Sequence, residues 1–264
     1  LDFLEGKFKL NNLRILKQFN GCCFADLDLK QQGVIEDFQL LFYIIQPPTP
    51  ERVKYDIFDR VNRGGTPLNK QEMRNALYRG RCTRMLDKLC CSPEFLIATG
   101  RSINKERMKD QYVVLRAMAF LMLHRGEFKD IPALQYRGDI DDFLARFMVY
   151  VNDNAPEKLI VDYENLFIRC MQISYDLLGE NGFRFSGNGI RRPINMPLFE
   201  ALSYLFSFVP EKIDYTWASR LILDIESVKE EFDDSRYFSG NIDSTTSVSF
   251  RFDRMDKIRN RIQL

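Results

Sequence analysis

The residues whose types and spacing best suit binding chemistry lie between Phe58 and Leu68. Two adjacent glycines there leave backbone N–H groups open to a ligand, because glycine carries no Cβ atom. An asparagine can donate and accept hydrogen bonds, a threonine offers a hydroxyl, and nearby arginines can neutralise phosphate charge. The helix expected after this turn would point its positive N-terminal end at the same place. These features predict a phosphate- or nucleotide-binding turn formed by Asn62, Arg63, Gly64, Gly65, Thr66 and Arg74.

The same segment has a simpler interpretation as a plain connection between two helices. Paired glycines commonly end a helix, and a short glycine-capped turn between antiparallel helices needs no ligand. Local physics by itself leaves both interpretations open. In either one, Phe58 and Leu68 are expected to be apolar packing residues that fix the geometry of the turn.

Charge is unevenly distributed along a chain whose formal net charge is only +1. Between Arg60 and Cys91 eight basic residues accompany two acidic ones, whereas residues 211–247 hold nine acidic and four basic residues. A local basic field attracts phosphates whatever the total charge is, although a solvated helix face gives the same pattern. The candidate DNA contacts are three arginines of the basic segment and two in a later loop rich in glycine and asparagine: Arg79, Arg81, Arg84, Arg191 and Arg192.

The scarcity of histidine excludes several kinds of metal site. His124 is the only histidine of the 264 residues, so a histidine-based nuclease, a Cys₂His₂ zinc finger or a multi-histidine iron site lacks ligands. At the end of a predicted helix, His124 is expected to be a cap or a core residue. The six cysteines have no C-x-x-C spacing and are expected to be reduced, mostly buried thiols. Helix capping explains Asp139, Asp141 and Asp142, so no metal site is predicted.

The order of secondary structure predicts a small mixed module followed by a helical domain. Apolar runs on either side of Asn11-Asn12 suggest a hairpin, and the apolar run Leu40–Gln46 is typical of a buried strand. Thr49-Pro50-Glu51 begins a helix, and Asn69 with Glu72 resembles a capping box that begins a second one. Further helices are expected at about 105–125, 139–152, 157–178, 197–209, 215–232 and 252–263.

The sequence contains no sign of a membrane segment. No apolar run reaches the roughly 20 residues that span a bilayer, because Arg116 interrupts the longest one. The first ten residues mix charged and apolar side chains, unlike a signal peptide. We therefore expect a cytoplasmic protein without membrane partners. Its first residue is leucine rather than methionine, which suggests that part of the natural N-terminus is missing.

Several segments resemble the bacterial family typified by the GmrS half of the GmrSD modified-DNA restriction systems. The central one fits an F-x-x-x-N-x-x-G-x-x-L motif at Phe58, Asn62, Gly65 and Leu68. The resemblance implies a ParB-like α/β module at residues 1–95, incomplete at its N-terminus, and a helical domain at residues 96–264. The expected fold class is therefore α+β, predominantly α-helical. The resemblance touches nearly the whole chain, through residues 1–27, 58–76, 107–116, 194–202 and 245–252.

What the family implies about chemistry depends on a motif that this chain lacks. Members bind nucleoside triphosphates, and some hydrolyse them, through a D-G-Q-Q-R motif beside the F-x-x-x-N-x-x-G-x-x-L segment. No D-G-Q-Q-R occurs here, and in relatives it would lie just upstream of a segment like Leu1–Leu10. The resemblance implies binding of ATP, GTP or CTP with Mg²⁺ and leaves NTPase activity open. Many relatives also have an HNH-type nuclease domain, whose histidines are missing from this chain.

Two functions of different classes follow. The first is a nucleotide-binding, DNA-sensing regulatory subunit of a bacterial restriction or anti-phage defence system. Its partners would be DNA, modified or not, and a separate nuclease. The second is a DNA-binding or scaffold protein whose nucleotide site has decayed, which rests on the basic segment from Arg60 to Cys91. A second copy of the chain is a further candidate partner.

Overall fold

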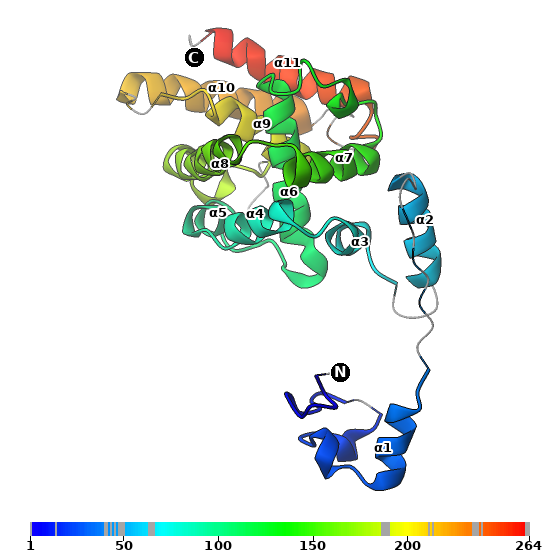
Figure 1. The fold of residues 1–264 in the computed structure, drawn as a ribbon. Helices are drawn as coiled ribbons and strands as arrows, with labels where there is room; N and C mark the ends of the chain where they lie inside the picture. The colour runs from blue at the N-terminus through cyan, green and yellow to red at the C-terminus, as the bar shows by residue number, and fades with distance from the viewer. Residues whose placement is uncertain are drawn as a thin grey trace. The chain divides into compact units, whose positions relative to one another are not determined.

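Helices account for every regular element that the computed structural model describes (Figure 1). The chain divides into two units, residues 1–49 and 50–264. In helix α2 (Glu51–Asn62) the backbone is described but six of the side chains are not. The described residues are 2–261 except 14, 40, 41, 43, 45, 47–50, 63–66, 186–190, 211, 213, 234–237 and 239.

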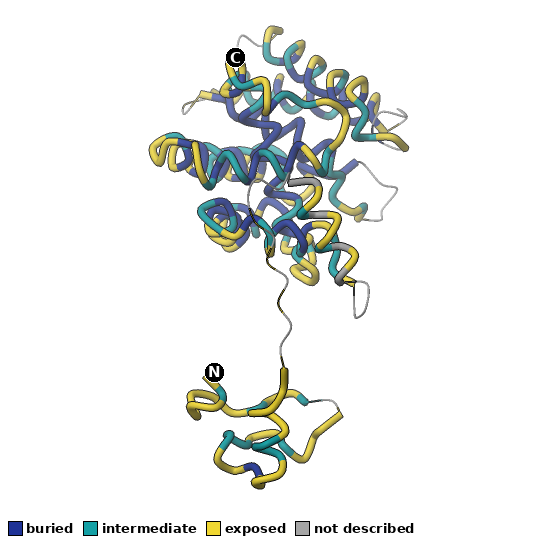
Figure 2. Tube along the Cα trace, turned by 45° about the vertical axis from the view of Figure 1, so that its right-hand side comes forward, coloured by how far each residue is buried: buried dark blue, intermediate teal, exposed yellow. Residues whose placement is uncertain are grey.

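The described part of the first unit holds one short helix and two single turns. These are η1 (Lys17–Phe19), η2 (Phe24–Asp26) and α1 (Leu29–Glu36). A capping box begins α1, because Asp28 Oδ1 accepts from the Gln31 backbone N–H at 2.7 Å and Gln31 Oε1 accepts from the Asp28 N–H at 3.1 Å. Leu27 is the only buried residue among those described in this unit (Figure 2). The unit therefore has almost no hydrophobic core of its own.

The predicted ParB-like α/β module is not seen, because the described residues contain no β-strand. Near the expected hairpin, the Leu10 N–H donates to the Cys22 carbonyl oxygen at 2.9 Å and the Gly21 N–H donates to the Leu10 carbonyl oxygen at 2.7 Å. The backbone is thus paired with a later turn instead of a neighbouring strand. The expected strand Leu40–Gln46 lies only partly within the described residues, where Phe42 is 76% exposed.

The physical reason is that apolar β-forming residues make a strand only when a partner strand pairs their backbone. Neither apolar run finds such a partner within the described ranges. The expected α+β class is therefore wrong, and the part of the chain that the structure describes is all helical.

The second unit begins with α2 and follows the predicted series of helices closely. The expected helices at 139–152, 157–178, 197–209 and 215–232 are confirmed. The boundary that differs most is the start of the last helix, which Ser244 caps: its Oγ accepts from the Ser247 N–H at 3.1 Å, so that helix begins where a loop was expected. After α2 come α3 (Lys70–Leu77), α4 (Arg81–Cys90), α5 (Pro93–Ala98), η3 (Glu106–Met108), α6 (Lys109–His124), η4 (Pro132–Leu134), α7 (Ile140–Asp153), α8 (Glu157–Leu178), η5 (Gly179–Asn181), α9 (Met196–Phe206), α10 (Tyr215–Asp233) and α11 (Thr245–Arg261).

The core of the second unit is built around α6 and α9, which pack against each other. Every residue from Pro197 to Phe206 is buried in α9, and so is every residue from Val113 to Met122 in α6 (Figure 2). Helices α8 and α11 pack against α9, while α4 and α7 pack against α6. These two helices therefore position the polar groups described below. No helix in the described ranges is both long and apolar enough to cross a membrane.

Candidate functional site

The turn predicted to bind nucleotides lies between α2 and α3, and the structure describes its two flanks. Arg63, Gly64, Gly65, Thr66 and the side chain of Asn62 lie outside the described residues, so their role stays a prediction. The apolar flanks, Phe58 and Leu68, are both partly buried. Partial burial is what packing residues beside a turn need.

A capping box fixes the second flank of this turn. Asn69 Oδ1 accepts from the backbone N–H groups of Gln71 at 2.8 Å and Glu72 at 2.9 Å, and Glu72 Oε2 accepts from the Asn69 N–H at 2.6 Å. These side chains satisfy N–H groups that have no carbonyl partner within the helix. The predicted capping box is confirmed, and it sets the residue at which the turn ends and α3 begins.

Arg107, just before α6, holds this flank in place through three hydrogen bonds. Asn69 Nδ2 donates to the Arg107 carbonyl oxygen at 2.7 Å, and Arg107 Nη2 donates to the Pro67 carbonyl oxygen at 2.7 Å and to Glu72 Oε2 at 3.1 Å. The hydrogen bond from Arg107, followed by that from the Asn69 N–H, lowers the pKa of Glu72 and keeps it ionised. Residues 58–76 and 107–116, two of the segments that carry the family resemblance, are thus in contact although they are far apart in the sequence.

Arg107 and Met108 have a backbone conformation that is unusual for their residue types. Their φ and ψ angles are 56° and 31° for Arg107, and 57° and 33° for Met108, in the left-handed helical region. This conformation costs roughly 1–2 kcal/mol for each residue that carries a Cβ atom, and it seldom occurs twice in succession. The contacts of Arg107 with the flank of the turn offset that cost.

Arg74, predicted to bind phosphate, lies inside the protein. Its side chain is 1% exposed; Nη1 donates to Asp141 Oδ1 at 2.8 Å and Nε donates to Gln71 Oε1 at 3.0 Å. The guanidinium also lies over the Tyr112 ring, 5.3 Å from its centroid, while Nη2 has no hydrogen-bond partner. Burial opposes ionisation of Asp141, but hydrogen bonds from Lys70 and Arg74 outweigh it and lower the pKa of Asp141. Arg74 therefore ties α3 to α7, and Asp141 balances its charge.

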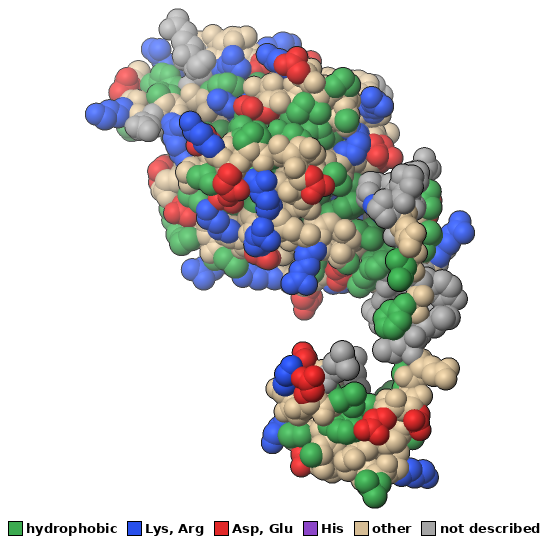
Figure 3. Space-filling model, viewed as in Figure 1, with side chains coloured by type: hydrophobic (Ala, Val, Ile, Leu, Met, Phe, Trp, Pro, Cys, Tyr) green, Lys and Arg blue, Asp and Glu red, His purple; other side chains and the backbone are tan. Residues whose placement is uncertain are grey.

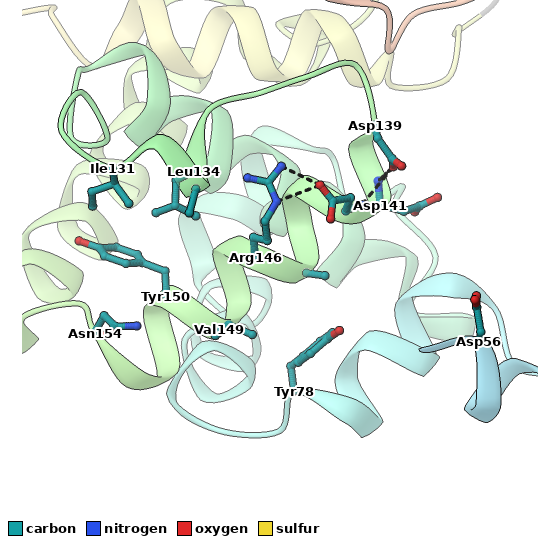
Figure 4. Close-up of a pocket in the computed structure, with 13 residues that line it drawn as sticks. Asp56, Tyr78, Ile131, Leu134, Asp139, Asp141, Arg146, Val149, Tyr150 and Asn154 are labelled. Atoms are coloured by element: carbon teal, nitrogen blue, oxygen red, sulfur yellow. Dashed lines mark hydrogen bonds and ion pairs between the residues drawn. The ribbon is translucent and has the colours of Figure 1, made fainter. Parts of the chain in front are cut away.

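A cleft of about 900 Å³ lies beside α7. One part of its lining is apolar and the other is acidic. Figure 4 shows Ile131, Leu134 and Tyr150 on the side opposite Asp56 and Asp139. A pocket of this size can hold a small molecule or several side chains of a partner.

The carboxylates of this cleft already have partners, with one exception. Asp139 Oδ1 accepts from the backbone N–H groups of Asp141 and Asp142, each at 3.1 Å. Asp142 forms an ion pair with Arg146 at 2.8 Å, and Asp141 is paired with α3. Asp56 makes no hydrogen bond or ion pair with the described residues. A lining with this excess of carboxylates disfavours a triphosphate, so the cleft is a poor candidate for the predicted nucleotide site.

Potential metal ligands do not cluster in the described part of the chain. No group of three or more His, Cys, Asp or Glu residues there could hold a metal ion. Cys82, Cys90 and Cys170 are buried free thiols, and burial raises the pKa of each. These thiols are protonated at neutral pH and serve as small core residues.

Three of the five arginines predicted to contact DNA are engaged within the protein. Besides its ion pair with Glu157, Arg81 donates to the Ala155 carbonyl oxygen at 2.9 Å, and so joins α4 to the start of α8. Basic and acidic side chains are interspersed over the face of the larger unit that Figure 3 shows. The ion pairs join Arg81 to Glu157 at 2.8 Å, Arg191 to Glu180 at 2.7 Å, and Arg192 to Asp233.

The other two, Arg79 and Arg84, differ from this group. Both are exposed, and neither makes a hydrogen bond or ion pair with the residues that the structure describes. They flank the start of α4 and lie five positions apart in the sequence. Their charges are therefore available to phosphate groups of a bound polymer.

A buried ion cluster in the core was missed by sequence reasoning. Glu200 has no exposed surface and accepts from two buried arginines, from Arg116 Nε and from Arg251 Nη2, the latter at 2.6 Å. Arg116 Nη2 also donates to Asp243 Oδ1 at 2.6 Å. Burial opposes the charge of Arg116, but Glu200 and Asp243 outweigh it and raise the pKa of Arg116. The cluster ties α6, α9 and α11 together.

A signal for this cluster was present in the sequence. Arg116 and Glu200 each interrupt a mostly apolar run, and Arg251 lies between two phenylalanines. A charged residue in the middle of a buried helix must be paired, because an isolated buried charge is too unfavourable. The three residues also come from three separate segments of the family resemblance.

His124 ends α6 and packs into the aromatic core. Its ring stacks on Phe252 with centroids 3.6 Å apart, and the Tyr204 ring lies edge-on to it at 5.8 Å. Its Nε2 is buried and has no hydrogen-bond partner. Burial, followed by the charge of Arg251, lowers the pKa of His124 to about 3. The ring is therefore neutral at pH 7, as a core residue rather than a charged cap.

Comparisons of the chain with protein-family models, with curated proteins and with solved structures give no match. The GmrS-like resemblance and the functions that it implies therefore stay predictions. They rest on the sequence motif and on the contacts between the segments that carry it.

Proposed function

We propose that the chain is a nucleotide-binding, DNA-sensing regulatory subunit of a bacterial restriction or anti-phage defence system that acts with a separate nuclease. The observation that carries this proposal is the contact between the flank of the predicted nucleotide-binding turn and Arg107. A turn that only joined two helices would need no anchor from another part of the chain. An anchored flank fixes the positions of Pro67 and Asn69, with which the predicted turn ends.

Calorimetric titration with ATP, GTP and CTP in the presence of Mg²⁺ tests this function. We expect heat of binding for at least one nucleotide. In Asn62→Ala we expect about 10- to 100-fold weaker binding, because a hydrogen bond to a charged phosphate contributes about 1.5–3 kcal/mol. Asn260→Ala, at an exposed position of α11, is the matched control and should bind normally. No heat for any nucleotide, or equal affinity in all three proteins, contradicts the proposal.

The second candidate function is a DNA-binding or scaffold protein, and Arg79 and Arg84, which have no partner among the described residues, favour it. If Arg79 and Arg84 contact phosphates, the Arg79→Ala/Arg84→Ala double variant should bind duplex DNA more weakly. Its plot of log K against log salt should also be shallower by about 2, since each phosphate contact contributes about 0.9 to the slope. Arg220→Ala, exposed on α10, should leave the slope unchanged. Absence of DNA binding by the unaltered protein at low salt rejects this function.

A further inference from the structure

The start of α6 is the place where local sequence preference and observed conformation disagree most. No glycine or proline occurs from Lys105 to His124. Residues 105–108, Lys-Glu-Arg-Met, are all strong helix formers. The sequence accordingly predicts a helix from about residue 105, yet α6 begins only at Lys109.

Two residues alone interrupt the longer helix. Lys105 and Lys109 have right-handed helical angles, and only Arg107 and Met108 between them are left-handed within η3 and its junction with α6. The cap that a longer helix would need is already in place, because Asn104 Oδ1 accepts from the Glu106 N–H at 2.8 Å. Rotation of these two residues into the right-handed region would join η3 to α6.

The hydrogen bonds of the junction show what opposes this rotation. The Arg107 carbonyl oxygen accepts from Asn69 Nδ2 at 2.7 Å. In a continuous helix that oxygen would accept from the backbone N–H of Gln111, four residues later. The Gln111 N–H instead donates to Asp110 Oδ1 at 2.9 Å. In the observed form the Arg107 carbonyl oxygen is thus bound to Asn69, and rotation into the longer helix would pull it away from that partner.

We propose that α6 is a two-state helix whose length Asn69 controls. In the short form seen here Asn69 holds the Arg107 carbonyl, and α6 begins at Lys109. In the long form Asn69 has moved away, the Arg107 carbonyl accepts from Gln111, and the helix begins at Lys105 with Asn104 as its cap. Because Asn69 also caps α3, any displacement of Asn69 changes the α3 cap and the α6 start together.

A change in the length of α6 would couple the predicted nucleotide-binding turn to the core of the second unit. Helix α6 carries Arg116 of the buried ion cluster and packs against α9. A change in the first turn of α6 therefore takes place next to the central packing of the second unit. The link from a bound nucleotide to this change rests on the proposed function. The two forms of the helix do not, since both are set by bonds within the chain.

Hydrogen exchange of the whole chain without nucleotide tests the two-state helix. The variant Asn69→Asp keeps an oxygen to cap α3 but removes the amide donor to Arg107. We expect the backbone amides of Lys109, Asp110 and Gln111 to exchange about tenfold more slowly than in the unaltered protein, because each gains a carbonyl partner in the long form. Amides of α9 serve as the internal reference and should not change.

A second variant keeps the test independent of other effects of Asn69→Asp. Adding Met108→Gly favours the left-handed conformation and disfavours the helix, so the double variant should return the three amides to their original exchange rates. Asn69→Ser, which also keeps a capping oxygen, should behave like Asn69→Asp. Unchanged or faster exchange in both Asn69 variants overturns the proposal, and so does slow exchange that persists with Met108→Gly. Because no nucleotide is present, neither result depends on the calorimetry.

Discussion

Replacement of Glu200 by alanine is expected to lower the free energy of unfolding of the second unit by about 3–5 kcal/mol. Glu200 has no exposed surface and binds Arg116 and Arg251, which are buried as well. Without it, two guanidinium groups remain in the interior with Asp243 as the one nearby carboxylate of the cluster. The loss is a large part of the stability of an ordinary domain, about 5–15 kcal/mol. Urea unfolding followed by circular dichroism measures it.

The matched control for this prediction is Glu230→Ala. Glu230 lies exposed on α10 and makes no hydrogen bond or ion pair with the described residues. Its removal should change the unfolding free energy by no more than about 0.5 kcal/mol. Glu200→Gln, which keeps the shape and one acceptor, should fall between the two. Equal stability of the Glu200 and Glu230 alanine variants would show that the buried cluster is not held as described.

Acidification from pH 7 to pH 4 is expected to remove about 3 kcal/mol of stability through His124 alone. Burial, followed by the charge of Arg251, lowers the pKa of His124 to about 3 from an ordinary value of 6.5. Between these two values the unfolded chain binds a proton that the folded chain does not. The unfolding free energy therefore falls as the pH falls, by about 1.4 kcal/mol per pH unit below about pH 6. Above pH 6.5 this contribution is constant.

His124→Phe isolates this effect from the titration of carboxylates. Phenylalanine can keep the ring stack on Phe252, 3.6 Å from the His124 centroid, but it does not titrate. Unfolding free energies of the two proteins should differ by a constant amount at pH 7–8 and diverge below about pH 6, with the variant becoming relatively more stable. Parallel curves from pH 7 to pH 4 would mean that His124 is protonated equally in the folded and unfolded states.

Helices were predictable from this sequence because their signals are local. The helix α8 spans Glu157–Leu178, as predicted, since Pro156 and Gly179 mark its ends. The capping box of Asn69 was readable for the same reason. Strands depend on a partner elsewhere in the chain, so the apolar run Leu40–Gln46 carried no information about whether such a partner exists. The prediction of an α+β class was wrong for this reason.

Parts of the candidate site could not be predicted from the sequence, because they too depend on partners elsewhere in the chain. Arg74 belongs to a basic segment, and nothing near it in the sequence reveals that Asp141 neutralises it. Arg107 and Met108 are good helix formers whose left-handed conformation depends on Pro67, Asn69 and Glu72. In each case a tertiary contact decides the role of the residue, and local preference points elsewhere.

The buried ion cluster also constrains how this protein can be synthesised. Glu200 meets its second arginine only after Arg251 has been added, 51 residues later. At about 5–20 residues per second that interval lasts several seconds. During it, α9 carries a carboxylate that α6 alone must balance, while the apolar face that α11 covers stays open. The second unit therefore cannot complete its core until α11 has been synthesised.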